Sequence, residues 1–189
     1  ATMGWSPYKD ANEMMDWLEE GASPQEVIQR LHNRYGNDWG GGQINIVDVQ
    51  GRSIAATGNE TMWKGQKIGQ NYATSGNILA GPEVVDSFAD TFEKTEDSDI
   101  PLAERLLMAL LAADRVGGDA RGRMGATLVV KKKRPGGVRP NNVDDYVNLR
   151  IDNSRSAIHD LANLYYRWRS ARNQEPGFRV MEQSRGTDV

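Results

Sequence analysis

The fold is decided by Ser75-Gly76-Asn77-Ile78-Leu79-Ala80-Gly81-Pro82-Glu83-Val84-Val85, the stretch where β-type segments give way to a series of helices. Gly81-Pro82-Glu83 predicts a helix start, because proline at the first helical position costs no hydrogen bond and an acid in the first turn suits the helix dipole. Asn77 is a polar residue framed by glycines at the end of a strand, and such connections often carry functional residues. The stretch therefore predicts a strand-to-helix corner with Asn77 as a candidate binding residue.

Helical periodicity flanks this corner on both sides. Apolar residues recur at the i, i+3, i+4 and i+7 spacing, and glycine, proline and capping residues mark the ends of each segment. The clearest start is Ser23-Pro24-Gln25-Glu26, which has the pattern of a capping box. The five predicted helices run from Ser6-Pro7 to Gly21, from Ser23 to Gly36, from Pro82 to Phe92, from Asp99 to Gly117, and from Asn153 or Ser154 to Arg172.

Short β-type segments fill the rest of the chain. Ile44–Val49 and Ser53–Thr57 predict a hairpin about Gln50-Gly51, and Gly69–Thr74 predicts a strand that leads into the corner. The continuous apolar run 126–130 is typical of a strand covered on both faces, so it is the candidate for the sheet centre. Residues 146–151 alternate apolar and polar, which predicts its antiparallel partner. The expected fold class is α+β.

Composition limits the classes of protein that fit. The 189 residues suit one domain, predicted over 1–172, with a polar tail at 173–189. A net charge of −3 gives no reason to expect a nucleic-acid partner. The absence of cysteine excludes disulfides and thiol chemistry and leaves the compartment undetermined. No apolar run approaches the roughly 20 residues of a membrane span.

The common catalytic and cofactor motifs are missing. His32 and His159 both fall on predicted helices without ligand spacing, so no metal site is predicted. There is no dinucleotide fingerprint, phosphate loop or serine elbow, and no cofactor is predicted. The basic run Lys131-Lys132-Lys133-Arg134 is better interpreted as protection of a strand end than as a nucleic-acid patch.

Three residues remain as candidate substrate-binding groups. Asp119 and Arg121 lie on a glycine-rich turn, where either Arg121 or Arg123 suits a substrate carboxylate. The alternative is that Asp119 caps the turn and pairs with Arg121, as turn aspartates commonly do. For Asn77 the alternative to a site role is local satisfaction of the backbone between flexible glycines.

Two motifs carry a resemblance to a known family. They are Gly76-Asn77-Ile78-Leu79-Ala80-Gly81-Pro82 and Gly117-Gly118-Asp119-Ala120-Arg121-Gly122, supported by further ordered pieces up to about Leu164. With them the chain resembles an uncharacterised family of Ntn-hydrolase-like proteins, known only as a domain of unknown function. The resemblance implies a four-layer αββα sandwich and hydrolysis of a C–N bond in a small amide.

The start of the chain departs from that family. The resemblance implies additional N-terminal strands, the first of which presents a Thr, Ser or Cys nucleophile whose freed α-amine acts as base. Ala1 occupies that place here, so Thr2 would become the terminal residue only after one further cleavage. Thr2 is accordingly the candidate catalytic residue, with Asn77, Asp119 and Arg121 as candidate polar lining.

Two functions are compatible with these observations. The first is an Ntn-type amide hydrolase, or its processed or truncated large piece. The second is a non-catalytic binding or assembly protein on the same scaffold. Because the implied N-terminal strands are absent from this chain, we expect a sheet edge to be completed by a second copy or by a separate N-terminal peptide. Folding of residues 1–7 or of the C-terminal tail over that edge is the alternative.

Overall fold

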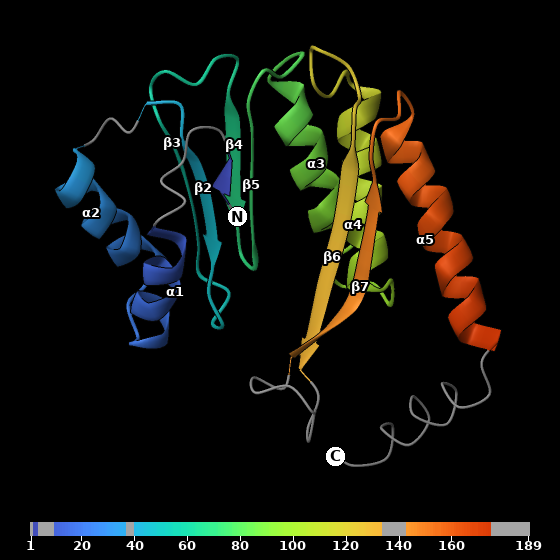
Figure 1. Ribbon diagram of the computed structural model, residues 1–189, viewed down its shortest axis with the longest axis horizontal. Helices are drawn as coiled ribbons and strands as arrows, with labels where there is room; N and C mark the ends of the chain where they lie inside the picture. The colour runs from blue at the N-terminus through green and yellow to red at the C-terminus, as the bar shows by residue number, and fades with distance from the viewer. Residues whose placement is uncertain (1, 4–9, 37–39, 134–142, 175–189) are drawn as a thin grey trace. The chain divides into compact units, whose positions relative to one another are not determined.

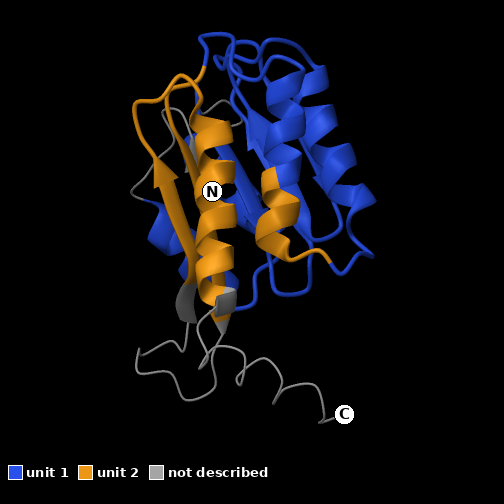
Figure 2. Cartoon of the chain, turned by 90° about the vertical axis from the view of Figure 1, so that its right-hand side faces the viewer, with its two compact units in different colours: residues 1–99, 108–122 blue, residues 100–107, 123–189 orange. Residues whose placement is uncertain are grey.

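The computed structural model describes residues 2–3, 10–36, 40–133 and 143–174. The predicted helix start at Ser6-Pro7 and most of the predicted tail at 173–189 lie outside the described residues. The chain divides into two compact units, residues 1–99 with 108–122 and residues 100–107 with 123–189 (Figure 2). The predicted single domain over 1–172 stays a prediction.

In the first unit, two helices cover one face of a three-stranded antiparallel sheet (Figure 1). The sheet has the order β1-β2-β3, with β1 at Thr2–Met3, β2 at Gln43–Val47 and β3 at Ser53–Thr57. The helices are α1, Ala11–Glu19, and α2, Pro24–Tyr35. The predicted hairpin of β2 and β3 is confirmed, in a register that pairs each residue from Gln43–Thr57 to Val47–Ser53.

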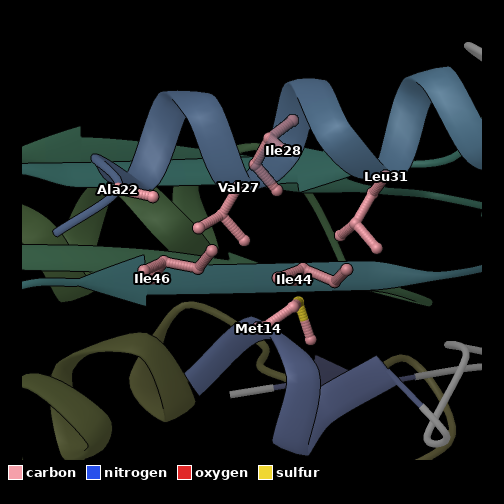
Figure 3. Close-up of a cluster of buried hydrophobic side chains, with 7 residues drawn as sticks. All are labelled: Met14, Ala22, Val27, Ile28, Leu31, Ile44 and Ile46. Atoms are coloured by element: carbon pink, nitrogen blue, oxygen red, sulfur yellow. The ribbon is translucent and has the colours of Figure 1, made fainter. Parts of the chain in front are cut away.

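Helix α2 begins where the sequence predicts. Ser23 Oγ accepts from the Glu26 amide at 3.2 Å, and the Ser23 amide donates to Glu26 Oε2 at 2.6 Å, which confirms the capping box. Its apolar side chains then meet alternate residues of β2 in a buried cluster (Figure 3). The cluster consists of Met14, Ala22, Val27, Ile28, Leu31, Ile44 and Ile46.

A hairpin of β4, Gly65–Gly69, and β5, Tyr72–Gly76, packs against β2 and β3. Helix α3, Glu83–Lys94, lies on the hairpin's other face, where Lys67 Nζ contacts Asp86 at 3.0 Å. Gly65 permits this close packing, because a Cβ there would stand 2.8 Å from a Val85 methyl group.

The sequence predictions failed on this hairpin. No strand was predicted at 65–69, so β4 was missed, and the following strand was placed at 69–74 instead of 72–76. Two glycines and two polar residues among the five residues of β4 hide its β character. The turn falls at 70–71, where Asn71 has φ +66°, a conformation that asparagine tolerates better than most residues.

The second unit contains a two-stranded antiparallel sheet and helix α5. Strand β6, Ala126–Lys133, pairs with β7, Val143–Ile151, and α5 spans Ala157–Gln174. The predicted antiparallel pair is confirmed. The prediction of a central strand covered on both faces is wrong, because β6 pairs with β7 alone among the described residues and Val129 is 44% exposed. An apolar run alone does not distinguish a covered strand from a half-exposed one.

Helix α4, Leu102–Arg115, begins in the second unit and ends in the first. Within the second unit, Glu104 of α4 pairs with Arg169 of α5 and accepts a hydrogen bond from Tyr166 Oη. Gly117 and Gly118 follow α4 with φ of +122° and +57°, which confirms the predicted helix stop. Over its described residues the chain is thus a mixed α+β structure with small antiparallel sheets and five helices, which confirms the α+β part of the predicted fold class.

Leu31→Ala is expected to lower the free energy of unfolding by about 2–5 kcal/mol, because the Leu31 side chain is fully buried and the surrounding cluster will not collapse into the cavity. Leu102→Ala at the 48% exposed start of α4 is the control, with an expected change within about 0.5 kcal/mol. Urea unfolding measures both. Equal losses in the two variants would contradict the assignment of Leu31 to the core.

Tyr72 makes the stability of the first unit depend on pH in the alkaline range. Burial, together with its 2.5 Å hydrogen bond to Glu93, raises the pKa of Tyr72 to about 12. Because the pKa is raised in the folded state, protonated Tyr72 stabilises the fold. This contribution to the free energy of unfolding is complete below the unfolded pKa of 10.0 and is lost as the pH rises towards 12. The free energy of unfolding should therefore fall more steeply over this range in the native protein than in Tyr72→Phe. Parallel curves would contradict the assignment.

Candidate functional site

Asn77 joins the two sheets of the first unit. Its Nδ2 donates to Gln43 Oε1 on β2 at 2.8 Å. Gln43 is only 1% exposed, and its own Nε2 donates to Thr57 Oγ1 at 3.2 Å and to the Gly76 carbonyl at 2.9 Å. The Asn77 side chain is therefore fixed by a side chain of the facing sheet, a partner that sequence reasoning did not identify.

The hydrogen bonds continue along the space between the sheets. Thr57 Oγ1 donates to Gln66 Oε1 at 2.8 Å, and Gln66 Nε2 donates to the Ala55 carbonyl at 3.2 Å. Gln43, Thr57, Gln66 and Asn77 form what we call the inter-sheet network. Ser75 lies opposite Gln66 in the β4–β5 register, and its buried Oγ has no hydrogen-bond partner among the described residues.

All four members of the inter-sheet network are neutral carboxamides or hydroxyls. Such groups donate and accept hydrogen bonds without changing charge near neutral pH. They suit recognition of a neutral polar group, or stabilisation of an oxyanion that forms during a reaction. The unpartnered Ser75 hydroxyl adds a polar atom that a ligand or an ordered water would satisfy.

The corner after Asn77 is strained. Ile78 has φ +50°, a region that β-branched residues rarely occupy. Backbone hydrogen bonds hold it on both sides: its amide donates to the Met62 carbonyl at 2.9 Å, and its carbonyl accepts from the Ala120 amide at 2.8 Å. Strain of this kind costs on the order of 1–3 kcal/mol and gathers at functional sites. The corner therefore holds Asn77 in a position that local preference alone would not select.

The Asp119 turn lies beside the same corner. Asp119 forms an antiparallel bridge with Leu79, and the Ala80 amide donates to the Gly118 carbonyl at 2.9 Å. The structure thus brings together the two motifs that carry the family resemblance. Ile78 of the first motif and Asp119 of the second are 41 residues apart in sequence.

Asp119 and Arg121 bond to each other. Arg121 donates to Asp119 Oδ1 from its amide at 2.8 Å and from Nε at 3.0 Å, and its Nη2 reaches Oδ2 at 2.7 Å. This hydrogen bonding lowers the pKa of Asp119 and raises the pKa of Arg121. The pairing predicted as the alternative to a substrate role is therefore present. The Arg121 side chain is still 63% exposed, and its substrate role stays a prediction.

Thr2 pairs with the residue next to Gln43 and with no member of the network. In the β1–β2 register Thr2 pairs with Ile44, and Met3 pairs with Gln43. Ile44 belongs to the buried cluster with the helices, whereas Gln43 bonds between the sheets. The residue of β1 that pairs with a network member is thus Met3 and not Thr2. The catalytic role of Thr2 stays a prediction.

Other possible sites are distinct from the network. A cavity of about 550 Å³ and an adjoining one of about 280 Å³ are lined by α1 and by β2 with its turn, including Met15, Leu18 and Val47. Asp48 and Arg52 at the first cavity pair with each other at 2.5 Å. Within the described ranges, no group of three or more His, Cys, Asp or Glu residues is placed to hold a metal ion. The described helices include none that could span a membrane.

Residues 1–161 match the model of DUF1028, a family of unknown function. The chain belongs to this family. Among solved structures, it is similar to the crystal structure of protein SPO2555 from Silicibacter pomeroyi, which is described with the same DUF1028 family model. The TM-score is 0.68 at 26% identity, over 88% of this chain and 70% of that one. No match was found among curated proteins.

Family membership confirms the part of the resemblance that concerns a domain of unknown function. The hydrolase character implied by the resemblance stays a hypothesis. Sequence reasoning also missed Gln43, Thr57, Gln66 and Ser75 as site residues. A signal existed in Gln43-Ile44-Asn45-Ile46, where polar and apolar residues alternate, because such alternation places amides on the face opposite the core.

Asn77→Ala is expected to lower the free energy of unfolding by roughly 1–3 kcal/mol, because it leaves the buried Gln43 Oε1 without the donor that Asn77 supplies. Combined with Gln43→Ala in a double-mutant cycle, it should show a coupling of at least about 0.5 kcal/mol. Asn33→Ala on the exposed face of α2 is the matched control. Additive losses from Asn77 and Gln43 would contradict a direct interaction between them.

Proposed function

We propose that the protein hydrolyses the C–N bond of a small amide in the manner of N-terminal-nucleophile hydrolases. The observation that carries this proposal is the Asn77–Gln43 hydrogen bond at 2.8 Å, which fixes an amide donor beside the strained Ile78 corner. The succession of α1 and α2, the β1–β3 sheet, the β4–β5 hairpin and α3 in the first unit supports the αββα sandwich that this class uses.

The proposed chemistry assigns Asn77 to the carbonyl oxygen. A hydroxyl attacks the amide carbon, and negative charge develops on the carbonyl oxygen as the tetrahedral intermediate forms. The Asn77 amide carries two N–H donors, one of which bonds to Gln43. Donation to the developing oxyanion is the role that this group would play, and one such donor typically accounts for 10²–10³ in kcat.

The remaining steps balance the reaction. The amine leaves with the proton taken from the hydroxyl, and the acyl group remains on the hydroxyl oxygen as an ester. Water then hydrolyses this ester, which releases the acid and regenerates the hydroxyl. Thr2 is the proposed nucleophile, with an α-amine of pKa near 8 as base when it belongs to the same residue. Asp119 and Arg121 are the proposed polar lining on the adjoining turn.

A second function is favoured by one specific observation. Every member of the inter-sheet network is neutral, and neutral amides are equally suited to hold a polar ligand without reacting with it. The same scaffold would then be a non-catalytic binding protein. Asn77 is required in both cases, so the two functions differ in whether a bond is broken.

Native protein incubated with a panel of small amides tests the proposal through release of free amine. Asn77→Asp is expected to lower kcat by 10²–10³, because the carboxylate keeps the shape of the amide but cannot donate. Thr2→Ala should abolish turnover, and Thr2→Ser should restore part of it. Asn33→Asp, on the exposed face of α2, is the matched control and should leave kcat unchanged.

Several outcomes would contradict these assignments. Absence of amine release by folded native protein, together with retained amide binding, would favour the binding protein over the enzyme. Turnover that survives Thr2→Ala would exclude Thr2 as nucleophile. An unchanged kcat in Asn77→Asp would exclude the oxyanion role.

A further inference from the structure

Two large apolar side chains are exposed next to the Asn77 corner. Met62 and Trp63 are each 66% exposed. Their carbonyl oxygens accept hydrogen bonds from the amides of Ile78 and Leu79, at 2.9 and 3.0 Å. The two residues that follow Asn77 are therefore attached directly to the two residues that carry the exposed side chains.

Backbone and side-chain contacts hold the loop that carries Met62 and Trp63. Trp63 has φ +50°, in the left-handed region. Ile78, which precedes the hydrogen-bond partner of Trp63, Leu79, has the same φ of +50°. Lys64 Nζ donates to the Gly58 carbonyl at 2.7 Å and ties down the other end of the loop. A bulky aromatic residue in this conformation is uncommon, and the strain persists only because these contacts over-determine it.

A polar atom in the same loop is unused. Thr61 is 9% exposed, and its buried Oγ1 has no hydrogen-bond partner among the described residues. Buried hydroxyls are normally satisfied, so an unsatisfied one calls for an explanation such as a bound water or ligand atom. The loop therefore combines two large exposed apolar side chains with a polar atom that has no hydrogen-bond partner among the described residues.

We propose that Met62 and Trp63 form a specificity-determining surface that selects amides with an aromatic acyl group. The inference rests on the proposed function, since it assumes that the amide of the substrate binds at Asn77. An indole offers a large, rigid face at a low cost in conformational entropy, and aromatic pairs gain attraction beyond the area they bury. Methionine adds a polarizable contact that adapts to the ring.

The two roles separate along the substrate. The inter-sheet network supplies hydrogen bonds to the amide, and the Met62–Trp63 surface supplies the apolar contact to the group attached to it. Because this contact is the same in the ground state and the transition state, its removal should raise KM and leave kcat unchanged. A catalytic or merely structural role would not produce this split.

The test compares phenylacetamide with acetamide as substrates of native protein, Trp63→Ala and Trp63→Phe. Trp63→Ala is expected to raise KM for phenylacetamide about 10-fold or more, which is the usual range for a lost apolar contact. KM for acetamide and both kcat values should stay unchanged. Trp63→Phe should retain most of the preference. Val49→Ala is the control, because Val49 is 97% exposed and lies on the β2–β3 turn.

Binding measured by calorimetry separates failure of this inference from failure of the proposed function. If phenylacetamide and acetamide are both hydrolysed and Trp63→Ala leaves the KM ratio unchanged, the inference is overturned and the hydrolase stands. If neither is hydrolysed but phenylacetamide binds more tightly than acetamide, and only to protein that retains Trp63, the aromatic selection stands and the hydrolase fails. Failure of both compounds to bind overturns the inference.

Discussion

The first unit depends on a hydrogen bond between two side-chain amides, from Asn77 to Gln43. Two sheets that meet face to face normally bury apolar side chains between them. Here Gln43 is buried between the sheets and is satisfied by Asn77, Thr57 and the Gly76 carbonyl. A buried amide without partners would cost stability, so these hydrogen bonds fix the position of β5 against β2. Packing and the geometry of the candidate site are therefore determined by the same contacts.

The strained corner at Ile78 follows from the need to place Asn77 against the buried Gln43. The chain must leave β5 at Gly76, present Asn77 to Gln43, and begin α3 a few residues later. Ile78 adopts φ +50° within this short connection, and backbone hydrogen bonds to Met62 and Ala120 compensate for the strain. The loops 61–64 and 117–121 are thereby attached to the corner, although neither adjoins it in sequence. A single connection thus brings two loops that are distant in sequence to the candidate site.

Membership of DUF1028 defines a relationship and leaves the chemistry to be argued from the site. The site offers neutral donors, a buried unpartnered hydroxyl at Ser75 and an exposed aromatic residue nearby. Together these features would suit a ligand in which an uncharged polar group is joined to an apolar one. Amides with aromatic substituents have this chemistry, so the proposed hydrolase activity and the proposed specificity concern one class of substrate.

Local signals in the sequence by themselves determined the helices, the β2–β3 hairpin and the importance of the 75–85 stretch. The Ser23 capping box, the Gly117-Gly118 stop and the apolar spacing act over a few residues, so they are readable without knowledge of distant contacts. Strand β4 was missed because its five residues carry little intrinsic β preference, and packing against β3 and α3 stabilises it instead.

Only the tertiary structure decided which residues form the site. Gln43 and Asn77 are 34 residues apart, and no local pattern indicates that their amides meet. The same holds for Met62 and Trp63, whose position beside the corner follows from backbone hydrogen bonds across the fold. Asp119 and Arg121 show the opposite case, since two residues of separation allow a turn to pair them whatever the rest of the chain does. Short-range chemistry was therefore predictable, whereas the inter-sheet network depended on long-range packing.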